Sequence, residues 1–182
     1  MHRIIKADLY RYVATTSRKG LLKGLRIPGF RYMFYLRKAS FHKKFSLLGI
    51  WYRIILRRLS YKYGFQISPN TEIGEGFFIG HHGTIVMNDH ARIGKNCNIA
   101  HLTTIGQTNR GRLKGSPTIG DNVWIGTGTV IAGKINIGSN VLIAPNSFVN
   151  FDVPDHSLVL GNPAKIIEKK NPTEGYVNNV LE

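Results

Sequence analysis

The sequence predicts a mainly β protein, a parallel β-helix that follows an N-terminal α-helical segment. Two observations predict this architecture. An aliphatic residue, almost always isoleucine, returns at every sixth position through most of residues 66–160. Residues 1–65 lack this repeat and carry 16 Lys and Arg against one acidic residue, whereas residues 66–182 carry nine of each kind. We therefore divide the chain into a basic, aromatic-rich helical segment (1–65), a β-helix domain (66–160) and a C-terminal tail (161–182) that contains the sequence GNPAK.

The helical segment is expected to hold a short first helix over 2–16, a break at IPGF (27–30) and an amphipathic helix within 41–63. The apolar stripe of the last helix follows 4-3-4-3-4 spacing through Phe41, Phe45, Leu48, Tyr52, Ile55 and Leu59. Three uses of the segment stay open: a cap on the β-helix or on neighbouring subunits, an anchor on an anionic membrane surface, or an adapter for partner proteins. Nucleic-acid binding is not expected, because no matching motif is present.

The β-helix is predicted by three runs of the six-residue repeat, from Ile67 to Ile85, from Ile93 to Ile105 and from Ile119 to Val149. Six residues fit one short strand and a turn, so three units close a triangular coil of about 18 residues with the repeated side chain inside. Gly or Ala follows most repeated positions and lets the backbone turn the corner. Cys97 lies in an inward-facing phase and is expected to be a buried, inert thiol.

The cellular compartment is suggested by one cysteine and by the apolar stretches. A single cysteine excludes an intramolecular disulfide and fits a reducing compartment. The first residues, MHRIIKADLYRYV, lack the apolar core of a secretory signal, and FSLLGIWYRIIL (45–56) carries Arg53 and is too short to span a bilayer. We expect a cytoplasmic protein, with peripheral attachment to the inner face of the membrane as an open alternative.

The repeat slips twice, and both slips predict loops. Two residues are inserted around MNDH (87–90). Between Ile105 and Ile119 the gap is one unit plus eight residues, so QTNRGRLKGSPT (107–118) is expected to leave the coil as a basic loop.

Two histidines mark the expected functional corner. His81 and His101 each stand two places after a repeated Ile, and the 20 residues between them equal one coil plus the two inserted residues. Their side chains should therefore stack on one corner, about 4.8 Å apart. Thr127 and Pro145 continue this corner over three coils, on the order of 14 Å, a length that suits an extended pantetheine arm. We expect the basic loop 107–118 to lie beside this groove.

Three stretches carry a resemblance to a known family: SPNTEIGEGFFIGHHGTIV, TTIGQTNRGRLKGSPTIGDNVWIGTGTVIAG and VPDHSLVLGNPAKII. Over about residues 66–170 the chain resembles the hexapeptide-repeat acyltransferases, and within them the serine acetyltransferase branch, nearest to the capsular and surface-polysaccharide O-acetyltransferases. The resemblance implies a left-handed β-helix, a homotrimer, acetyl-CoA bound between neighbouring subunits and no metal.

The resemblance also assigns roles to single residues. The family's general base aligns with His81 and takes the proton of the acceptor hydroxyl as its oxygen attacks the thioester, which a neutral imidazole can do near pH 7. Backbone N–H groups in the groove can hold the oxyanion. Lys165 of GNPAK is placed to meet a phosphate of the coenzyme. The other expected coenzyme contacts are Gly106, Gln107, Gly126, Thr127, Ala144 and Pro145, and the expected acceptor contacts are His82, His101 and Arg110.

Three positions depart from the serine acetyltransferase pattern. Gln66 stands where that branch has the aspartate that orients its base, and Gly80 stands where it has an aspartate directly before the base. Ser116 stands where it has a second histidine. Because these groups grip a free amino acid, we expect the acceptor to be a sugar hydroxyl of a surface or capsular polysaccharide or of its lipid-linked precursor. Serine O-acetylation, N-acetylation of an amino sugar and a non-catalytic, membrane-associated trimeric scaffold stay open. A zinc carbonic anhydrase is not expected, because no two histidines are separated by four residues.

Overall fold

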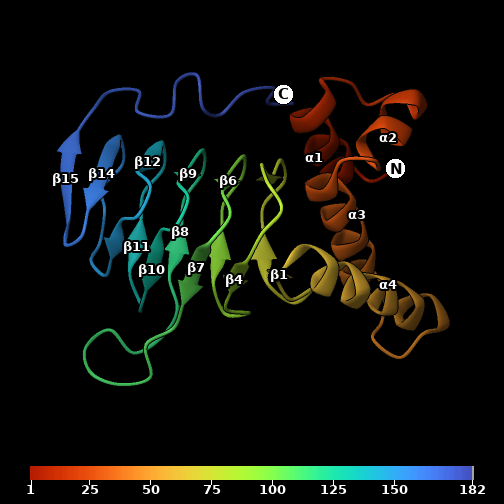
Figure 1. Cartoon of the computed structure of the whole chain (residues 1–182), viewed down its shortest axis with the longest axis horizontal. Coiled ribbons are helices and arrows are strands. Elements are labelled where there is room, and N and C mark those ends of the chain that lie inside the picture. The colour runs from red at the N-terminus through yellow and green to blue at the C-terminus, as the bar shows by residue number, and fades with distance from the viewer. Residues whose placement is uncertain (182) are drawn as a thin grey trace.

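The computed structural model describes residues 1–181, in which helices come first and a stack of short strands follows (Figure 1). The helices are α1 (Arg3–Val13), α2 (Arg18–Gly24), α3 (Pro28–Phe41) and α4 (Leu47–Tyr63). The strands are β1 (Phe65–Gln66), β2 (Glu72–Ile73), β3 (Phe78–Ile79), β4 (Ile85–Met87), β5 (Arg92–Ile93), β6 (Asn98–Ile99), β7 (Thr103–Gly106), β8 (Thr118–Ile119), β9 (Trp124–Ile125), β10 (Val130–Ala132), β11 (Asn136–Ile137), β12 (Val141–Ile143), β13 (Phe148–Val149), β14 (Ser157–Gly161) and β15 (Ala164–Glu168).

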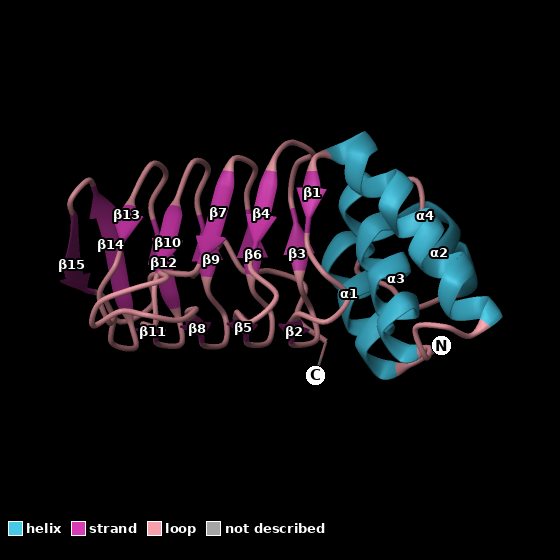
Figure 2. Cartoon of the chain, turned by 90° about the horizontal axis from the view of Figure 1, so that it is seen from below, coloured by secondary structure: helices cyan, strands magenta, loops and turns pink. Residues whose placement is uncertain are grey.

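The strands form three sheets, and each coil gives one strand to each sheet. The sheets have the orders β1-β4-β7-β10-β13, β2-β5-β8-β11 and β3-β6-β9-β12-β14-β15, which we call sheets A, B and C. Neighbouring strands are parallel except for β14 and β15, which form an antiparallel hairpin at the far end. Figure 2 shows the coils stacked along one axis, with the helices covering the end at β1. The predicted β-helix with an N-terminal helical segment is confirmed.

The repeated aliphatic residues fill the interior of the triangle. Ile79 pairs with Ile99, Ile99 with Ile125, and Ile125 with Ile143, so equivalent positions lie one above another. These side chains are almost completely buried. Burial contributes about 1.5–3 kcal/mol for each such side chain relative to its exposure to water, which explains why the six-residue period dominates the sequence. Cys97 is buried in the same interior, as predicted, and burial raises the pKa of its thiol to about 12.

The helices pack onto the first coil as a cap. Pro28 begins α3, the Ser46 hydroxyl accepts a hydrogen bond from the Gly49 N–H and caps the start of α4, and Gly64 ends α4 with a positive φ of 78°. Apolar residues of α3 and α4 share one core with the isoleucines of the β-helix; among them are Tyr32, Met33, Leu36, Leu56, Leu59 and Tyr63.

The predicted helices differ from the observed ones in three respects. The short first helix expected over 2–16 is α1, whereas α2 and α3 were not predicted, and the break expected at 27–30 is where α3 begins. The helix predicted within 41–63 begins only at Leu47, because residues 42–46 form the turn between α3 and α4. The predicted apolar stripe is divided: Phe41, Phe45 and Leu48 are exposed, and only its later members contact the core.

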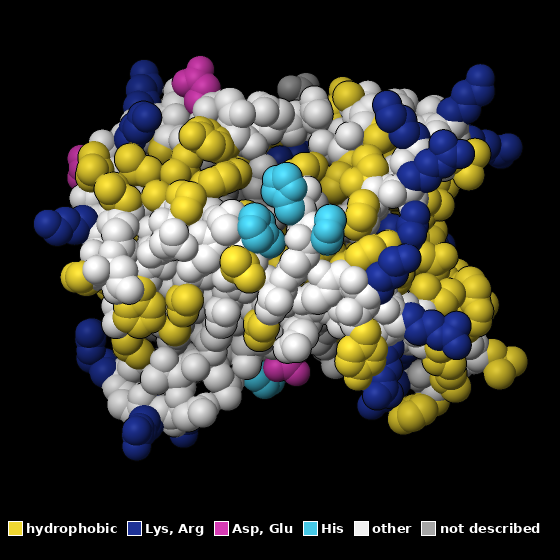
Figure 3. Space-filling model, viewed as in Figure 1, with side chains coloured by type: hydrophobic (Ala, Val, Ile, Leu, Met, Phe, Trp, Pro, Cys, Tyr) yellow, Lys and Arg dark blue, Asp and Glu magenta, His cyan; other side chains and the backbone are white. Residues whose placement is uncertain are grey.

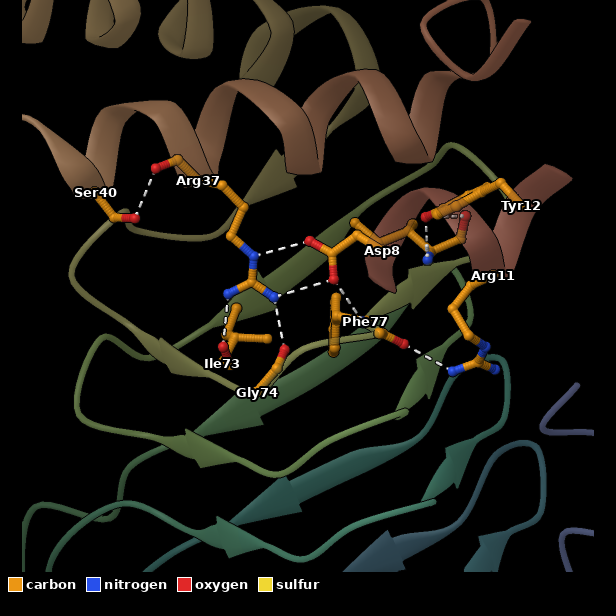
Figure 4. Close-up of polar contacts among 10 residues, drawn as sticks. Asp8, Arg11, Tyr12, Arg37, Ser40, Ile73, Gly74 and Phe77 are labelled. Carbon is orange, nitrogen blue, oxygen red and sulfur yellow. Dashed lines mark hydrogen bonds and ion pairs between the residues drawn. The ribbon is translucent and has the colours of Figure 1, made fainter. Parts of the chain in front are cut away.

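A buried ion pair ties the cap to the first coil (Figure 4). Arg37 of α3 donates to both carboxylate oxygens of Asp8 of α1, at 2.9 and 3.3 Å, and to the carbonyl oxygens of Ile73 and Gly74, at 2.6 Å each. The Phe77 N–H donates to Asp8 at 3.0 Å. Since both charged side chains are almost fully buried, these bonds fix the two helices against the turn between β2 and β3.

The C-terminal residues run back along the β-helix towards the helices (Figure 1). Asn98 donates to the Tyr176 carbonyl oxygen, and Arg11 of α1 donates to the Asn178 carbonyl oxygen, at 2.8 and 2.7 Å. The boundary expected between residues 160 and 161 falls inside β14, because the last strand of the stack extends to Gly161.

Candidate active site

The corner between sheets C and A carries the two stacked histidines. His81 follows β3, His101 follows β6 and Thr127 follows β9, each two residues after an isoleucine of the in-register row. The ring centroids of His81 and His101 are 5.8 Å apart, and the rings are nearly perpendicular at 85°. Figure 3 shows a group of histidine side chains on this face of the molecule, near the junction with the helices. The stacking predicted from their spacing is confirmed.

The backbone beneath His81 is held by the helical cap. The Tyr12 hydroxyl of α1 accepts a hydrogen bond from the Ile79 N–H at 2.7 Å, and its ring lies 4.4 Å from the ring of Phe78. Burial raises the pKa of Tyr12, so its hydroxyl stays neutral. Sequence reasoning missed Tyr12, because nothing in the spacing of α1 connects it with a strand 67 residues further along the chain.

The two histidines differ in their surroundings. His81 and His82 are exposed on the corner, whereas His101 is half-buried. Within residues 1–181, the buried Nδ1 atom of His101 makes no hydrogen bond. A buried polar atom without a partner costs about 1–3 kcal/mol, so the cost of this ring position is offset by other contacts of the corner.

The same corner extends to the hairpin that carries GNPAK. Pro145 follows β12, and Gly161 at the end of β14 occupies the next equivalent position, since Val159 pairs with Ile143. From His81 to Gly161 is four coil spacings, on the order of 19 Å. Lys165 is exposed on β15, opposite Leu160 and just past the hairpin turn. One continuous edge therefore joins the imidazole at one end to a lysine ammonium near the other.

At the middle of this edge the backbones of successive coils lie in close contact. A methyl group added at Gly126 would lie 2.6 Å from the Pro145 nitrogen of the next coil. The Gly126 N–H donates to Ile143, and the Ala144 N–H donates to Val159, at 2.9 and 2.7 Å. Gly126, Thr127, Ala144 and Pro145 thus lie together on the His81 corner, as the sequence predicted.

The basic loop lies on a different corner, which corrects the expected position beside His81. It leaves the coil after β7, a strand of sheet A, and spans 107–117 because Thr118 already belongs to β8. One face of the triangle therefore separates Gly106, Gln107 and exposed Arg110 from His81 of the same chain. The sequence could have shown this, because Ile79 and Ile85 are successive repeat positions and therefore belong to different faces of the triangle. The loop follows the face of Ile85, and His81 follows the face of Ile79.

The base of the loop is fixed, although its tip projects from the β-helix (Figure 1). Thr108 and Gly115 exchange backbone hydrogen bonds of 3.0 and 2.9 Å, and the Lys134 N–H donates to the Leu113 carbonyl oxygen at 2.8 Å. Gln107 donates from its side chain to Asn109 at 2.8 Å.

A cavity of about 540 Å³ opens on sheet A beside α4. Its polar lining includes Ser60, Gln66, Asn88 and Asp89, and Gly106 lines it from β7. His81 is not among its lining residues, so this cavity brings together Gln66 and Gly106 but not the stacked histidines. Ser116, another departure from the serine acetyltransferase pattern, donates to Asn88 at 2.9 Å near the same corner.

In the described part of the chain, no group of three or more His, Cys, Asp and Glu side chains could hold a metal ion. Among residues 1–181, no helix combines the length and the apolar character needed to cross a bilayer.

The comparisons with known proteins point to one group of enzymes. A family model for bacterial transferase hexapeptide repeats (six repeats) matches residues 116–150. Serine acetyltransferase 2 of Arabidopsis thaliana is 38% identical over 119 residues, which are 64% of this chain and 37% of that protein. Serine acetyltransferase of Staphylococcus aureus (strain Mu50) is 41% identical over 106 residues, which are 58% of this chain and 50% of that protein. The chain thus spans only about a third to a half of the length of these two relatives.

Solved structures extend the similarity to the helices. Serine acetyltransferase of Neisseria gonorrhoeae, in complex with serine, has a TM-score of 0.72 and 32% identity, covering 91% of this chain and 68% of that one. Serine acetyltransferase of Brucella abortus, in complex with coenzyme A, has a TM-score of 0.74 and 26% identity, covering 91% of this chain and 67% of that one.

These relatives correct the expected function. The polysaccharide O-acetyltransferase reading is wrong, because the relatives and structural neighbours are serine acetyltransferases. That reading depended on the resemblance to polysaccharide O-acetyltransferases and on the departures at Gln66, Gly80 and Ser116. Three departures weigh less than a similarity to a serine acetyltransferase that covers 91% of the chain. The chain belongs to the hexapeptide-repeat transferase family, with the serine acetyltransferases as its relatives.

Proposed function

We propose that the protein transfers an acetyl group from acetyl-CoA to the hydroxyl of serine. The observation that carries the proposal is the continuous edge from His81 to Lys165, with an exposed imidazole at one end and a cation near the other. Its length, on the order of 19 Å, suits a pantetheine arm with its phosphates towards Lys165. Relatives solved with serine and with coenzyme A support the choice of both substrates.

In the proposed reaction, neutral His81 accepts the proton of the serine hydroxyl while the oxygen attacks the thioester carbonyl carbon. A carbon–oxygen bond forms, and backbone N–H groups along the groove stabilise the oxyanion. The carbon–sulfur bond then breaks, and the departing thiolate takes the proton back from the imidazolium. The products are O-acetylserine and free coenzyme A.

Two neighbouring groups have supporting roles in this proposal. Tyr12 holds the Ile79 N–H and thereby fixes the strand that ends just before His81. The half-buried ring of His101, 5.8 Å from that of His81, limits the positions that the base can take. His82, exposed on the same turn, stays an expected acceptor contact.

The acceptor would be held without the two aspartates that the serine acetyltransferase pattern has. Gln66 and Asn88 line the cavity on sheet A and not the His81 corner, so they would have to come from the neighbouring chain that also supplies the loop. Their amide groups can donate to the carboxylate of serine or accept from its ammonium group. Neutral hydrogen bonds are weaker than charge-assisted ones. We therefore expect weaker discrimination between serine and related hydroxy amino acids than an ion-paired site would give.

We also propose that the active unit is a homotrimer in the cytoplasm. Loop 107–117 and the His81 corner lie on different corners of one chain, so a neighbouring chain must supply the loop if Gln107 and Arg110 are to reach the coenzyme. Light scattering at micromolar concentration measures the mass directly, and a monomer that is fully active would refute this assembly.

The experiment that tests the function follows the release of coenzyme A thiol from acetyl-CoA with and without serine. We expect release that depends on serine and that falls by about 10²–10⁴-fold in His81→Asn, because general-base catalysis contributes a factor of that order. The matched control is His156→Asn, an exposed histidine outside the two corners of the proposed site, which should keep the wild-type rate. Absence of serine-dependent release would refute the acceptor, and an active His81→Asn would refute the base.

A further inference from the structure

Helix α4 has two apolar faces, and only one of them packs against the protein. Leu56, Leu59 and Tyr63 are buried against α3 and the first coil. On the other side, Leu47, Ile50 and Ile54 are exposed at helical spacing, although side chains of this kind are usually buried. An exposed apolar patch of this kind marks a surface that another molecule or a membrane covers.

The exposed residues continue into the turn before the helix. Leu47 is 88% exposed and Phe45 is 83% exposed, and Leu48 and Trp51 are each about half exposed. We call the set the α4 patch; it consists of Phe45, Leu47, Leu48, Ile50, Trp51 and Ile54. Figure 1 shows the start of α4 and its preceding turn at the end of the molecule that points away from the β-helix. The patch can therefore reach a flat surface before the body of the protein does.

Basic side chains border the α4 patch. Lys43 and Lys44 precede it, and Arg57, Arg58 and Lys62 follow it, all of them exposed. Residues 1–65 contain a single acidic residue, Asp8, and its carboxylate is buried against Arg37. In Figure 3 apolar and basic side chains mix over the helices, without an acidic side chain among them in this view. The helical segment thus presents no acid of its own beside the patch.

We propose that the α4 patch docks on an anionic lipid surface. Apolar and aromatic side chains would enter the boundary between headgroups and acyl chains, and the flanking Lys and Arg would contact lipid phosphates. Trp51 suits such a boundary, because its ring is apolar and its N–H can reach water. This proposal is independent of the acceptor and of the His81 chemistry.

Charge argues against a two-fold contact in which the α4 patch of one chain covers the same patch of another. In a two-fold contact the same patch would meet itself, which would bring the Lys and Arg of both chains together. With no exposed acid from residues 1–65 to pair with them, like charges would oppose that contact, whereas an anionic bilayer attracts the same residues.

The test is co-sedimentation of the full chain with vesicles of phosphatidylcholine and phosphatidylglycerol in a 3:1 ratio, or of phosphatidylcholine alone. We expect binding to the anionic vesicles at low salt, and weaker binding in high salt or to neutral vesicles. Replacing Phe45 and Leu47 together by Ser should weaken partitioning by about tenfold or more. Leu22→Ser, at an exposed leucine of α2 that is 66% exposed, is the matched control and should leave binding unchanged.

Fluorescence gives a second readout. Trp124 packs against Tyr176, so a Trp124→Phe variant leaves Trp51 as the reporter, and its emission should shift to shorter wavelength with anionic vesicles. Failure to bind anionic vesicles at low salt would refute the proposal. Full binding by the Phe45→Ser/Leu47→Ser variant would also refute it. A lower mass of this variant than of the wild type in light scattering without vesicles would refute it too, because a second copy of the chain would then cover the patch. Thiol release with soluble substrates is unaffected in each case, which separates this result from a failure of the proposed function.

Discussion

Replacing Arg37 by methionine should lower the free energy of unfolding by about 3–5 kcal/mol, the usual cost of removing one partner from a buried ion pair. The substitution leaves the Asp8 carboxylate buried with only backbone N–H partners outside α1, among them that of Phe77 at 3.0 Å. It also removes the donors at 2.6 Å from the carbonyl oxygens of Ile73 and Gly74. Methionine occupies a similar volume, so lost charge and lost hydrogen bonds, rather than a cavity, account for the effect.

The pH dependence of the variant separates this cause from a general loss of packing. Burial without the guanidinium raises the pKa of the Asp8 carboxyl, as burial already does in the wild type. A carboxyl group whose pKa is raised in the folded state makes its full contribution to the free energy of unfolding below its unfolded pKa of about 3.9. That contribution is lost as the pH rises through the folded pKa. The deficit of Arg37→Met relative to the wild type should therefore be largest near pH 7 and should shrink towards pH 4.

Urea unfolding, followed by circular dichroism, measures both effects. Asp8→Asn in the Arg37→Met background removes the unpaired charge and should recover at least about 1 kcal/mol at pH 7. Arg3→Met is the control, because the Arg3 side chain is 69% exposed in its pair with Glu75 and should contribute less than about 1 kcal/mol. A loss below about 1 kcal/mol in Arg37→Met, or a deficit that is the same at pH 4 and pH 7, would refute the argument.

Three further predictions follow from single positions. Burial raises the pKa of the Cys97 thiol from 9.0 to about 12, so a thiol reagent at pH 8 should label it at least about 10³-fold more slowly in the native protein than in urea; rapid native labelling would contradict its burial. Gly29→Ala would bring a methyl group 2.2 Å from the Ile79 carbonyl oxygen and should cost about 1–3 kcal/mol in urea unfolding, whereas Gly80→Ala, whose nearest contact is 3.4 Å, should cost much less; equal losses would contradict the close approach of α3 to β3. Lys165→Ala should raise KM for acetyl-CoA by about tenfold with kcat nearly unchanged, as expected for a phosphate contact that is equal in ground and transition states; a lower kcat with unchanged KM would contradict that role.

The sequence alone determined the β-helix and the corner with the stacked histidines. The six-residue period has this power because each repeated isoleucine must face the interior, so the phase of every neighbouring residue is fixed locally. His81, His101, Thr127 and Pro145 could be assigned to one edge by counting. The acceptor could not be assigned this way, since Gln66, Gly80 and Ser116 indicate which contacts are absent and say nothing about those that replace them.

Only the tertiary structure decided how the helical segment is joined to the β-helix and what it leaves exposed. Asp8, Tyr12 and Arg37 meet residues far along the chain, and no periodic pattern connects α1 with the turn before β3. The apolar residues of 41–63 do not show which face of the helix is buried, because that depends on where α3 and the first coil lie. The β-helix follows from the sequence because each coil repeats the same local pattern. The position of the helical cap does not, because it depends on contacts between residues that are far apart in the chain.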